Sequence, residues 1–208
     1  MNLGNAKIVF WDFDGVIKDS VSVKARAFHA LFLPYGREVA EKVLEHHLAN
    51  CGMSRYEKLP LYLNWAGLGA SDRVIQDFAA KFSDAVEDAV VQSAWVPGVQ
   101  TVLATGSETS KFVLITATPQ AEIERILERL AIRRFFAQIV GAPIRKAAGI
   151  SAALADFGVQ PECALVIGDS REDLAAAQQC GVPFLLRRTP ENARTMPDYN
   201  GPQIAGFG

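Results

Sequence analysis

Acidic residues follow apolar runs at two widely separated places in the chain, where each needs a compensating partner. Asp12, Asp14 and then Gly15 end the first run, while Asp169 and Asp173 follow another run late in the sequence. Carboxylates are poor strand residues and costly to bury unless opposite charge offsets them. We therefore expect both acidic groups to meet at one site that binds a cation.

The first two acids are spaced for chemistry on a single ligand. Residues i and i+2 of an extended segment point to the same side, so Asp12 and Asp14 can face the same substrate. An aspartate beside a divalent cation can attack phosphorus and form an aspartyl-phosphate, and we assign this role to Asp12. Asp14 would protonate the leaving oxygen and later activate water as a base.

Magnesium is the cation that suits this set of oxygens. Mg²⁺ takes carboxylate, carbonyl and water oxygens, usually with few protein ligands. Asp12 and Asp169 can supply carboxylates, and Asp14 can supply its main-chain carbonyl. Asp173 can act directly or through a water molecule. The expected magnesium site therefore consists of these four aspartates.

Further residues at the same sheet edge are suited to hold a phosphate group. Lys146 can bind a phosphate oxygen as a point charge, with Arg145 as a rival, and Thr116 can donate a hydroxyl hydrogen bond. Gly15 allows backbone amides to approach the same oxygens. Ala117, which follows Thr116, is counted with these phosphate-binding residues.

The elements that must position these residues form a parallel sheet. Such unalternating apolar runs suit strands covered on both faces, and helical patterns separate the last four of them. This alternation predicts a doubly wound α/β sheet, whose ligands bind beyond the carboxyl ends of the strands. The five predicted strands are KIVFWDF, KFVLIT, FAQIV, CALVIG and VPFLLR.

The segment between the first two strands is much longer than a crossover of a dozen residues or so requires. Most of it has a helical pattern, so we expect an inserted α-helical cap domain at residues 21–92, with the core formed by residues 1–20 and 93–208. The tail after Thr189 is rich in Pro, Gly and Asn and is expected to be irregular. The cap helices are expected at 23–33, 38–49, 55–63 and 71–91.

Taken in order, these motifs resemble those of the haloacid dehalogenase (HAD) superfamily. The segments DFDGV, LITAT and GDSRED, with Lys146, look like its four ordered motifs, and WVPGV looks like its segment returning from an inserted cap. The resemblance implies a Rossmann-like core, a helical cap and phosphoryl-transfer activity, with the residue roles given above. It places the chain near the β-phosphoglucomutase and phosphoglycolate-phosphatase branch.

Within the expected cap, residues 52–55 form a G-x-S-R segment. This segment resembles the specificity loop of the β-phosphoglucomutase-like branch, in which the arginine faces the substrate. We therefore expect Arg55 to contact the substrate. Ser54 is also suited to cap the following helix, with Glu57 as the reciprocal acid.

Lys24 stands where that branch has a histidine that couples cap closure to catalysis. Lysine has an unperturbed pKa near 10.4, against about 6.5 for histidine, so it is poorly suited to the same proton work at neutral pH. This difference favours plain hydrolysis over a mutase reaction, although Lys24 could equally be a solvated helix residue. The adjacent His46 and His47 are expected on a solvated helix face.

Composition excludes several other classes of function. The chain has 208 residues, half of them hydrophobic, and a formal net charge of −2, which gives no indication of nucleic-acid binding. Its three scattered cysteines predict neither a disulfide framework nor a zinc site. Without a signal-peptide pattern or a membrane-spanning run, we expect a soluble, cytoplasmic protein without a membrane partner.

The function expected from the sequence is a Mg²⁺-dependent phosphatase acting on a small phosphorylated metabolite. A phosphosugar mutase is the alternative enzyme, and a non-catalytic binding or regulatory module on the same fold is the alternative from another class. Nucleophile, acid and lysine are all present, which argues against the module. A dehalogenase would need neither Asp14 as an acid nor the magnesium cluster. The sequence predicts no oligomeric state.

Overall fold

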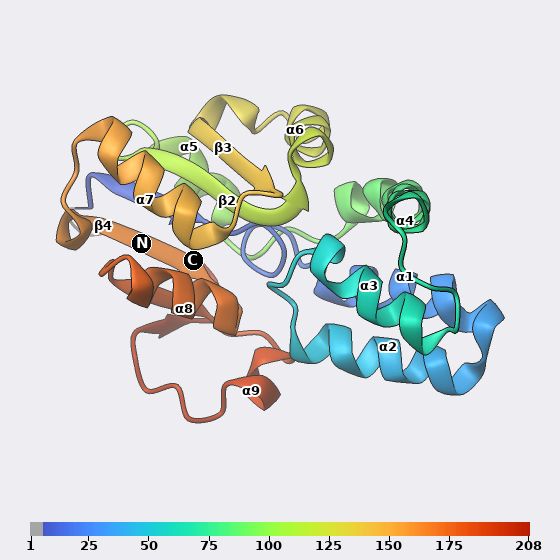
Figure 1. Cartoon of the computed structure of the whole chain (residues 1–208). Coiled ribbons are helices and arrows are strands. Elements are labelled where there is room, and N and C mark those ends of the chain that lie inside the picture. Colours follow the sequence, from blue (N-terminus) through green and yellow to red (C-terminus); the bar gives the residue numbers. More distant parts are fainter. Residues whose placement is uncertain (1–5) are drawn as a thin grey trace.

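The computed structural model describes residues 6–208 and is built around one six-stranded parallel sheet (Figure 1). The strand order is β3-β2-β1-β4-β5-β6, which confirms the predicted doubly wound α/β class. Because the chain turns back across β1 to reach β4, the crevice of the sheet opens between these two strands. The strands are β1 (Ile8–Trp11), β2 (Lys111–Pro119), β3 (Phe136–Ala142), β4 (Ala164–Gly168), β5 (Phe184–Arg187) and β6 (Gln203–Ile204).

Helices cover both faces of the sheet, and β1 shows why its sequence is apolar throughout. Val9 and Trp11 pack on the side of α5 (Val99–Gly106) and α6 (Gln120–Arg129). Ile8 and Phe10 pack on the opposite side, in the cluster that includes α7 and α8. Each face of the strand is therefore buried, as unalternating runs predict. The second pair of helices spans Lys146–Phe157 (α7) and Arg171–Gln179 (α8).

Four α-helices are inserted between β1 and α5, and they lie together beside the sheet (Figure 1). Phe28 stacks on Phe82 with ring centroids 3.8 Å apart and meets Tyr62 edge-on at 5.5 Å, which packs three of these helices together. All four predicted helices are found, with boundaries shifted by a few residues. They are α1 (Val21–Phe32), α2 (Arg37–Ala49), α3 (Arg55–Trp65) and α4 (Asp72–Gln92).

The chain enters and leaves this helical insertion through two segments that are paired with each other. The Asp19 amide donates to the Ala94 carbonyl at 2.8 Å, and the Val96 amide donates to Ile17 at 3.1 Å. The insertion is thus joined to the rest of the chain by two adjacent segments near the end of β1. The division into a core and a cap domain remains a prediction, and residues 1–5 of the predicted core lie outside the described residues.

The tail after Thr189 is more ordered than the sequence suggested. It contains α9 (Asn192–Thr195) and the edge strand β6, which pairs with β5. The expectation of an irregular tail is therefore wrong for these two elements. The Asn192 side chain donates to the carbonyls of Asp169 and Arg187, so α9 is fastened to the carboxyl ends of β4 and β5.

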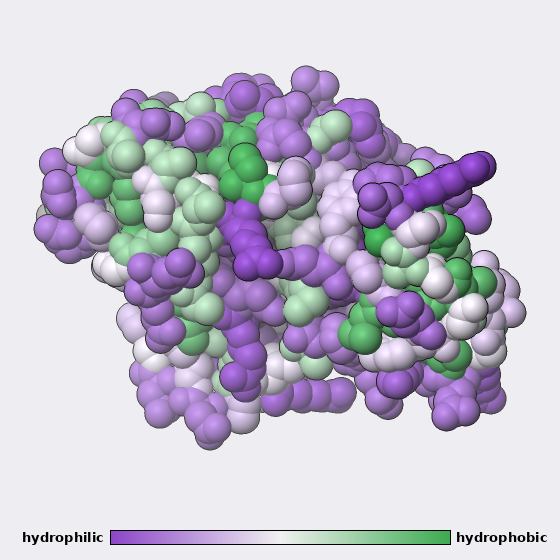
Figure 2. Space-filling view, viewed as in Figure 1, coloured by the Kyte–Doolittle hydropathy of each residue, from purple (hydrophilic) through white to green (hydrophobic). Residues whose placement is uncertain are grey.

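On the face shown in Figure 2, hydrophilic residues cover most of the surface and hydrophobic residues form small separate patches. Short 3-10 turns connect several elements, at Leu33–Tyr35 (η1), Arg133–Phe135 (η2) and Pro161–Cys163 (η3). None of the helices among residues 6–208 combines the length and apolar character needed to cross a bilayer.

Candidate active site

The carboxylate of Asp12 lies at the carboxyl end of β1, beside the ammonium group of Lys146. Lys146 begins α7, and its Nζ lies 3.0 Å from Asp12 Oδ1 and 2.6 Å from Asp173 Oδ1. Burial and the neighbouring charge of Asp173 raise the pKa of Asp12 to about 7, although Lys146 opposes the shift. Burial also opposes the charge of Lys146, but the two carboxylates raise its pKa above the ordinary lysine value. The expected pairing of a buried acid with a lysine is present.

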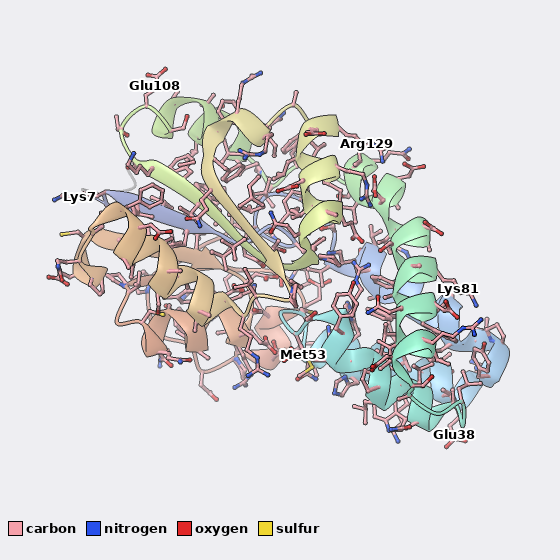
Figure 3. All side chains as sticks on the ribbon, turned by 45° about the horizontal axis from the view of Figure 1, so that its top comes forward. Lys7, Glu38, Met53, Lys81, Glu108 and Arg129 are labelled. Atoms are coloured by element: carbon pink, nitrogen blue, oxygen red, sulfur yellow. The ribbon has the colours of Figure 1, made fainter. Side chains whose placement is uncertain are left out.

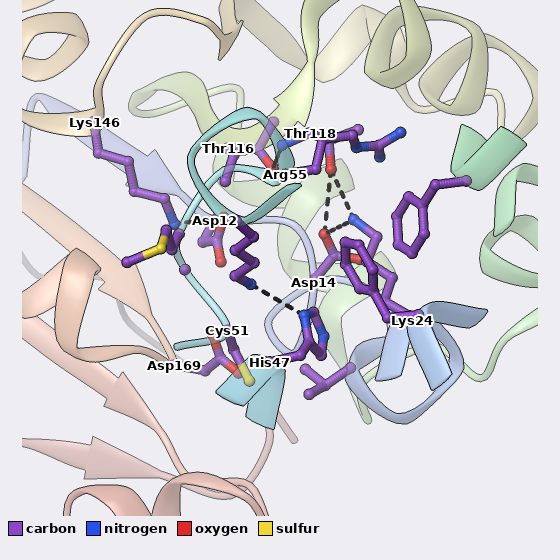
Figure 4. Close-up of a pocket in the computed structure, with 17 residues that line it drawn as sticks. Asp12, Asp14, Lys24, His47, Cys51, Arg55, Thr116, Thr118, Lys146 and Asp169 are labelled. Carbon is purple, nitrogen blue, oxygen red and sulfur yellow. Dashed lines mark hydrogen bonds and ion pairs between the residues drawn. The ribbon is translucent and has the colours of Figure 1, made fainter. Parts of the chain in front are cut away.

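Asp14 is held by three donors on the other side of the same turn. Ser20 Oγ donates to its Oδ1 at 2.5 Å, Lys24 Nζ pairs with its Oδ2, and Thr118 Oγ1 lies 3.3 Å from Oδ2 (Figure 4). Burial alone would raise the pKa of Asp14, but Lys24 and the Ser20 hydrogen bond outweigh burial and lower it. This arrangement therefore holds Asp14 as a carboxylate.

Three carboxylates gather where a divalent cation would be held. Asp12, Asp169 and Asp173 each offer an oxygen, and these oxygens lie within 4.8 Å of one another. Burial and the charges of Asp12 and Asp173 raise the pKa of Asp169 well above its usual value. Three buried acids this close favour a bound cation, since their charges otherwise repel. The donor set therefore fits the hard cation expected from the sequence.

Gly15 is the position that makes this convergence possible. Its φ of +77° lies in the left-handed region, and a Cβ there would overlap the Asp169 carboxylate. The glycine thus allows the turn after β1 to press directly against the residue that follows β4.

Asp173 is tied to the protein through both of its carboxylate oxygens. Its Oδ2 accepts hydrogen bonds from Ser170 N at 3.1 Å and Ser170 Oγ at 2.5 Å, while its Oδ1 meets Lys146. Ser170 in turn caps α8, which completes a capping box. Of the two roles expected for Asp173, these contacts favour the indirect one through water and the orientation of Lys146.

A cavity joins these groups to the helical insertion. Asp12, Asp14, Thr116, Lys146 and Asp169 are among the core residues that line it, and residues of the insertion form its other side (Figure 4). The cavity therefore lies between the end of the sheet and the insertion.

Arg145, the rival of Lys146, is exposed and pairs with Glu57 outside the cavity, with Nη2 and Oε1 2.9 Å apart. Of the two cations, Lys146 is therefore the one that lines the cavity with Asp12. Glu57 is used in this pair and does not complete the expected capping box, whereas Ser54 does cap α3 by accepting from the Tyr56 amide.

Arg55 lies on α3, in the part of the insertion that faces the core. It lines the cavity, and its guanidinium forms a bidentate ion pair with Glu122 of α6. Nη1 lies 2.8 Å from Oε2 of Glu122, and Nη2 lies 2.7 Å from Oε1. Ser83 of α4 also accepts from Nη1 at 2.6 Å, and the guanidinium lies over the Phe82 ring. Arg55 therefore ties the insertion to the core, and the substrate contact expected for it stays a prediction.

Three cavity residues were missed or misplaced by the sequence reasoning. Lys24 is buried against Asp14 and is not a solvated helix residue, and His47 is buried where a solvated face was expected. Lys58 was assigned no role, yet it lines the cavity and is almost fully buried. Lys24 and Lys58 could have been found, because each lies within the buried stripe of its helix, four residues before Phe28 and Tyr62.

A comparison with known proteins identifies the family of this chain. A family model described as haloacid dehalogenase-like hydrolase matches residues 9–186. A phosphoglycolate phosphatase of Pseudomonas putida is 28% identical over 182 residues, covering 85% of this chain and 67% of the relative. One from Photorhabdus laumondii is 27% identical over 188 residues, covering 87% and 80%.

Among solved structures, CbbY from Rhodobacter sphaeroides in complex with phosphate has a similar fold. The TM-score is 0.76 with 17% sequence identity, and the match covers 97% of this chain and 95% of CbbY. Identity this low supports the fold alone.

Proposed function

The chain belongs to the haloacid dehalogenase-like hydrolase family, and on that premise we propose a Mg²⁺-dependent phosphatase that hydrolyses phosphoglycolate or a closely similar small phosphorylated metabolite. The family and the phosphoglycolate phosphatases among its relatives make the protein a phosphoric monoester hydrolase. The finer statements, on substrate, metal and residue roles, are our proposal. A cytoplasmic location also remains a prediction.

The observation that carries the proposal is the buried Asp12 carboxylate beside Lys146, in the wall of the cavity between core and insertion. In the first step, an Asp12 oxygen attacks phosphorus and the bond between phosphorus and the ester oxygen breaks. The electron pair leaves with that oxygen, which takes a proton from Asp14. In the second step, water attacks the phosphorus of the aspartyl-phosphate, and the Asp12 carboxylate is restored as inorganic phosphate leaves.

Lys146 and Thr116 are the proposed holders of the phosphoryl oxygens, together with backbone amides near Gly15 and Ala117. Lys146 contributes a buried positive charge that stabilises the oxygens as negative charge develops on them. Thr116 is buried at the cavity wall and offers a hydroxyl donor. These groups orient the phosphoryl group for in-line attack by Asp12.

Asp14 is the proposed acid and base, and its contacts with Ser20 and Lys24 fix the position of its carboxylate. Ser20 and Lys24 hold the carboxylate form, which is the form that takes a proton from the attacking water. Donation to the leaving oxygen requires the protonated form, so Asp14 takes up a proton from solvent before the first step and regains one from the attacking water in the second. Lys24 is therefore a positioning residue for the proton transfer.

Magnesium fits the acidic cluster described above, with Asp12, Asp169 and the Asp14 carbonyl as proposed ligands and Asp173 behind them. When bound, the ion would neutralise charge on the phosphoryl oxygens and on the carboxylates. Gly15 and Lys146 already shape the space around these oxygens without it.

The test is phosphate release by the purified protein from a panel of small phosphomonoesters that includes 2-phosphoglycolate. We expect activity with Mg²⁺, loss of activity with excess chelator, and poor replacement by Ca²⁺, whose looser coordination would misplace Asp12. The Asp12→Asn variant is the control for contaminating phosphatases and should retain less than a few per cent of the activity. Full activity in chelator, or in Asp12→Asn, would overturn the proposal.

A further inference from the structure

Lys58 is a buried cation on the substrate cavity that the proposed chemistry does not use. It lies on α3, is 1% exposed, and its Nζ is 3.0 Å from Nδ1 of His47 on α2. Both residues line the cavity that also holds Asp12 and Lys146. Figure 4 places His47 on the side of the cavity opposite Thr116, within the wall contributed by the insertion.

Lys58 differs from the other cations of this cavity in having no acidic partner. Lys24 pairs with Asp14, Arg55 with Glu122, and Lys146 with Asp12 and Asp173. Within residues 6–208, no carboxylate oxygen lies within 4.0 Å of Lys58 Nζ, and its contacts are the His47 ring and, at 6.0 Å, the Phe28 ring.

An ammonium group without a counter-ion is costly to bury. Burial lowers the pKa of Lys58 to about 8 against opposing effects of Cys51 and Glu172, and the charge of Lys24 acts in the same direction as burial. Burial and Lys58 lower the pKa of His47 well below its usual range, so His47 accepts a hydrogen bond as a neutral ring. The pair thus carries one buried positive charge, and no anion among the described residues lies close enough to form an ion pair with it.

From this geometry we propose that Lys58, oriented by His47, determines substrate specificity by binding a carboxylate at the far end of the phosphomonoester. The inference rests on the proposed function, because it assumes that the phosphoryl group sits at Asp12 and Lys146. The substrate class is then a short phosphorylated carboxylic acid. Its carboxylate supplies the anion that the protein itself does not place beside Lys58.

Two substrates of nearly equal size isolate this contact. In 2-phosphoglycolate the group at the far end is a carboxylate, and in 2-hydroxyethyl phosphate it is a neutral hydroxymethyl group. We expect the wild type to have a kcat/KM at least tenfold higher for 2-phosphoglycolate. Lys58→Met should bring this ratio close to one, chiefly by raising KM for 2-phosphoglycolate, and leave kcat/KM for 2-hydroxyethyl phosphate within about twofold. Lys58→Arg should restore much of the preference.

Lys81→Met is the matched control, because Lys81 is an exposed lysine of the same insertion, on the outer side of α4 (Figure 3). It should leave the ratio unchanged. A Lys58→Met variant that loses activity on both substrates equally would indicate a structural role and overturn the inference. Preference of the wild type for ethylene glycol bisphosphate over 2-phosphoglycolate would also overturn it, since the favoured anion would then be a phosphate.

A binding measurement separates this inference from the proposed function. Calorimetry of 2-phosphoglycolate with the Asp12→Asn protein requires no turnover. Adding Lys58→Met should weaken binding at least tenfold, and adding Lys81→Met should not change it. Equal affinity with and without Lys58, or no binding at all, would overturn the inference even in an active phosphatase. An inactive wild type that still binds through Lys58 would overturn only the hydrolysis.

Discussion

At the scale of single residues, the site is a set of buried charges, most of which are matched within hydrogen-bonding distance. Lys146 lies between Asp12 and Asp173, and Lys24 meets Asp14. Because an unpaired buried charge is costly, each pairing both stabilises the fold and sets the protonation state that the chemistry starts from.

The Lys24 contact leads to a prediction for catalysis. Lys24→Met removes the cation that holds Asp14, so we expect kcat to fall by about a hundredfold, within the usual range for general acid–base catalysis. KM should change by less than about threefold, because the phosphate holders Lys146 and Thr116 are untouched. Steady-state kinetics on the best substrate of the panel checks this. A variant with wild-type kcat would show that Lys24 has no part in positioning Asp14.

At the scale of elements, the helical insertion is fastened to the core by ion pairs of different exposure. Arg55 of α3 and Glu122 of α6 form a bidentate pair with side chains 4% and 2% exposed. Arg145 and Glu57 also bridge core and insertion, but their side chains are 83% and 44% exposed. Only the first pair is shielded from solvent, so the two should differ greatly in their effect on stability.

We predict that Glu122→Gln destabilises the protein, because it leaves Arg55 buried without its counter-ion. Breaking a buried pair from one side costs about 3 kcal/mol or more, which for a chain of this size corresponds to a fall of roughly 6 to 12 °C in Tm. Thermal unfolding followed by circular dichroism measures the change.

Glu57→Gln is the matched control and should leave Tm unchanged within error. Replacing both partners of the buried pair, as in Arg55→Met with Glu122→Leu, should recover most of the lost stability, since no buried charge then remains unpaired. Equal Tm changes in Glu122→Gln and Glu57→Gln would contradict the assignment of the stabilising contact.

At the scale of the whole molecule, the active site is assembled from a sheet edge and from a helical layer that covers it. The core supplies the groups proposed to react, and the insertion supplies most of the remaining cavity wall, with Met53 lying at the junction of the two (Figure 3). A cover of this kind excludes bulk water and selects the ligand.

The packing of the insertion over the core also affects which molecule accepts the phosphoryl group. A mutase must keep its aspartyl-phosphate from water until a sugar hydroxyl arrives, so its acid should engage only when substrate closes the cap. Here Asp14 is already engaged by Lys24 and Ser20 in the covered arrangement. We therefore expect water to be the acceptor.

Incubation with hexose phosphates, followed by ³¹P NMR, should give inorganic phosphate as the only new product, with Asp12→Asn as the blank. Efficient formation of a positional isomer, with little phosphate release, would contradict hydrolysis and favour the mutase.

The sheet, the helical insertion and the acids of the core could be predicted from the order of the amino acids. Apolar runs without alternation specify buried parallel strands, and the motifs that follow them necessarily meet at one sheet edge. The sequence pattern alone therefore predicts that Asp12, Asp14, Lys146 and Asp169 lie together. Local pattern was enough, because each residue is fixed by the strand or helix directly next to it.

The partner that each cation of the insertion meets depends on how the helices pack in three dimensions, and the sequence pattern did not predict it. Arg55 and Glu122 are 67 positions apart, and their pairing depends on how α3 and α6 approach each other. Lys58 and His47 face each other only because α2 and α3 pack side by side around Phe28. Because the side chains of lysine and arginine are long, each can reach several places, and the pattern within one helix does not predict which distant carboxylate it meets. The proposed recognition of substrate by Lys58 therefore emerges from packing, whereas the proposed chemistry at Asp12 follows from sequence.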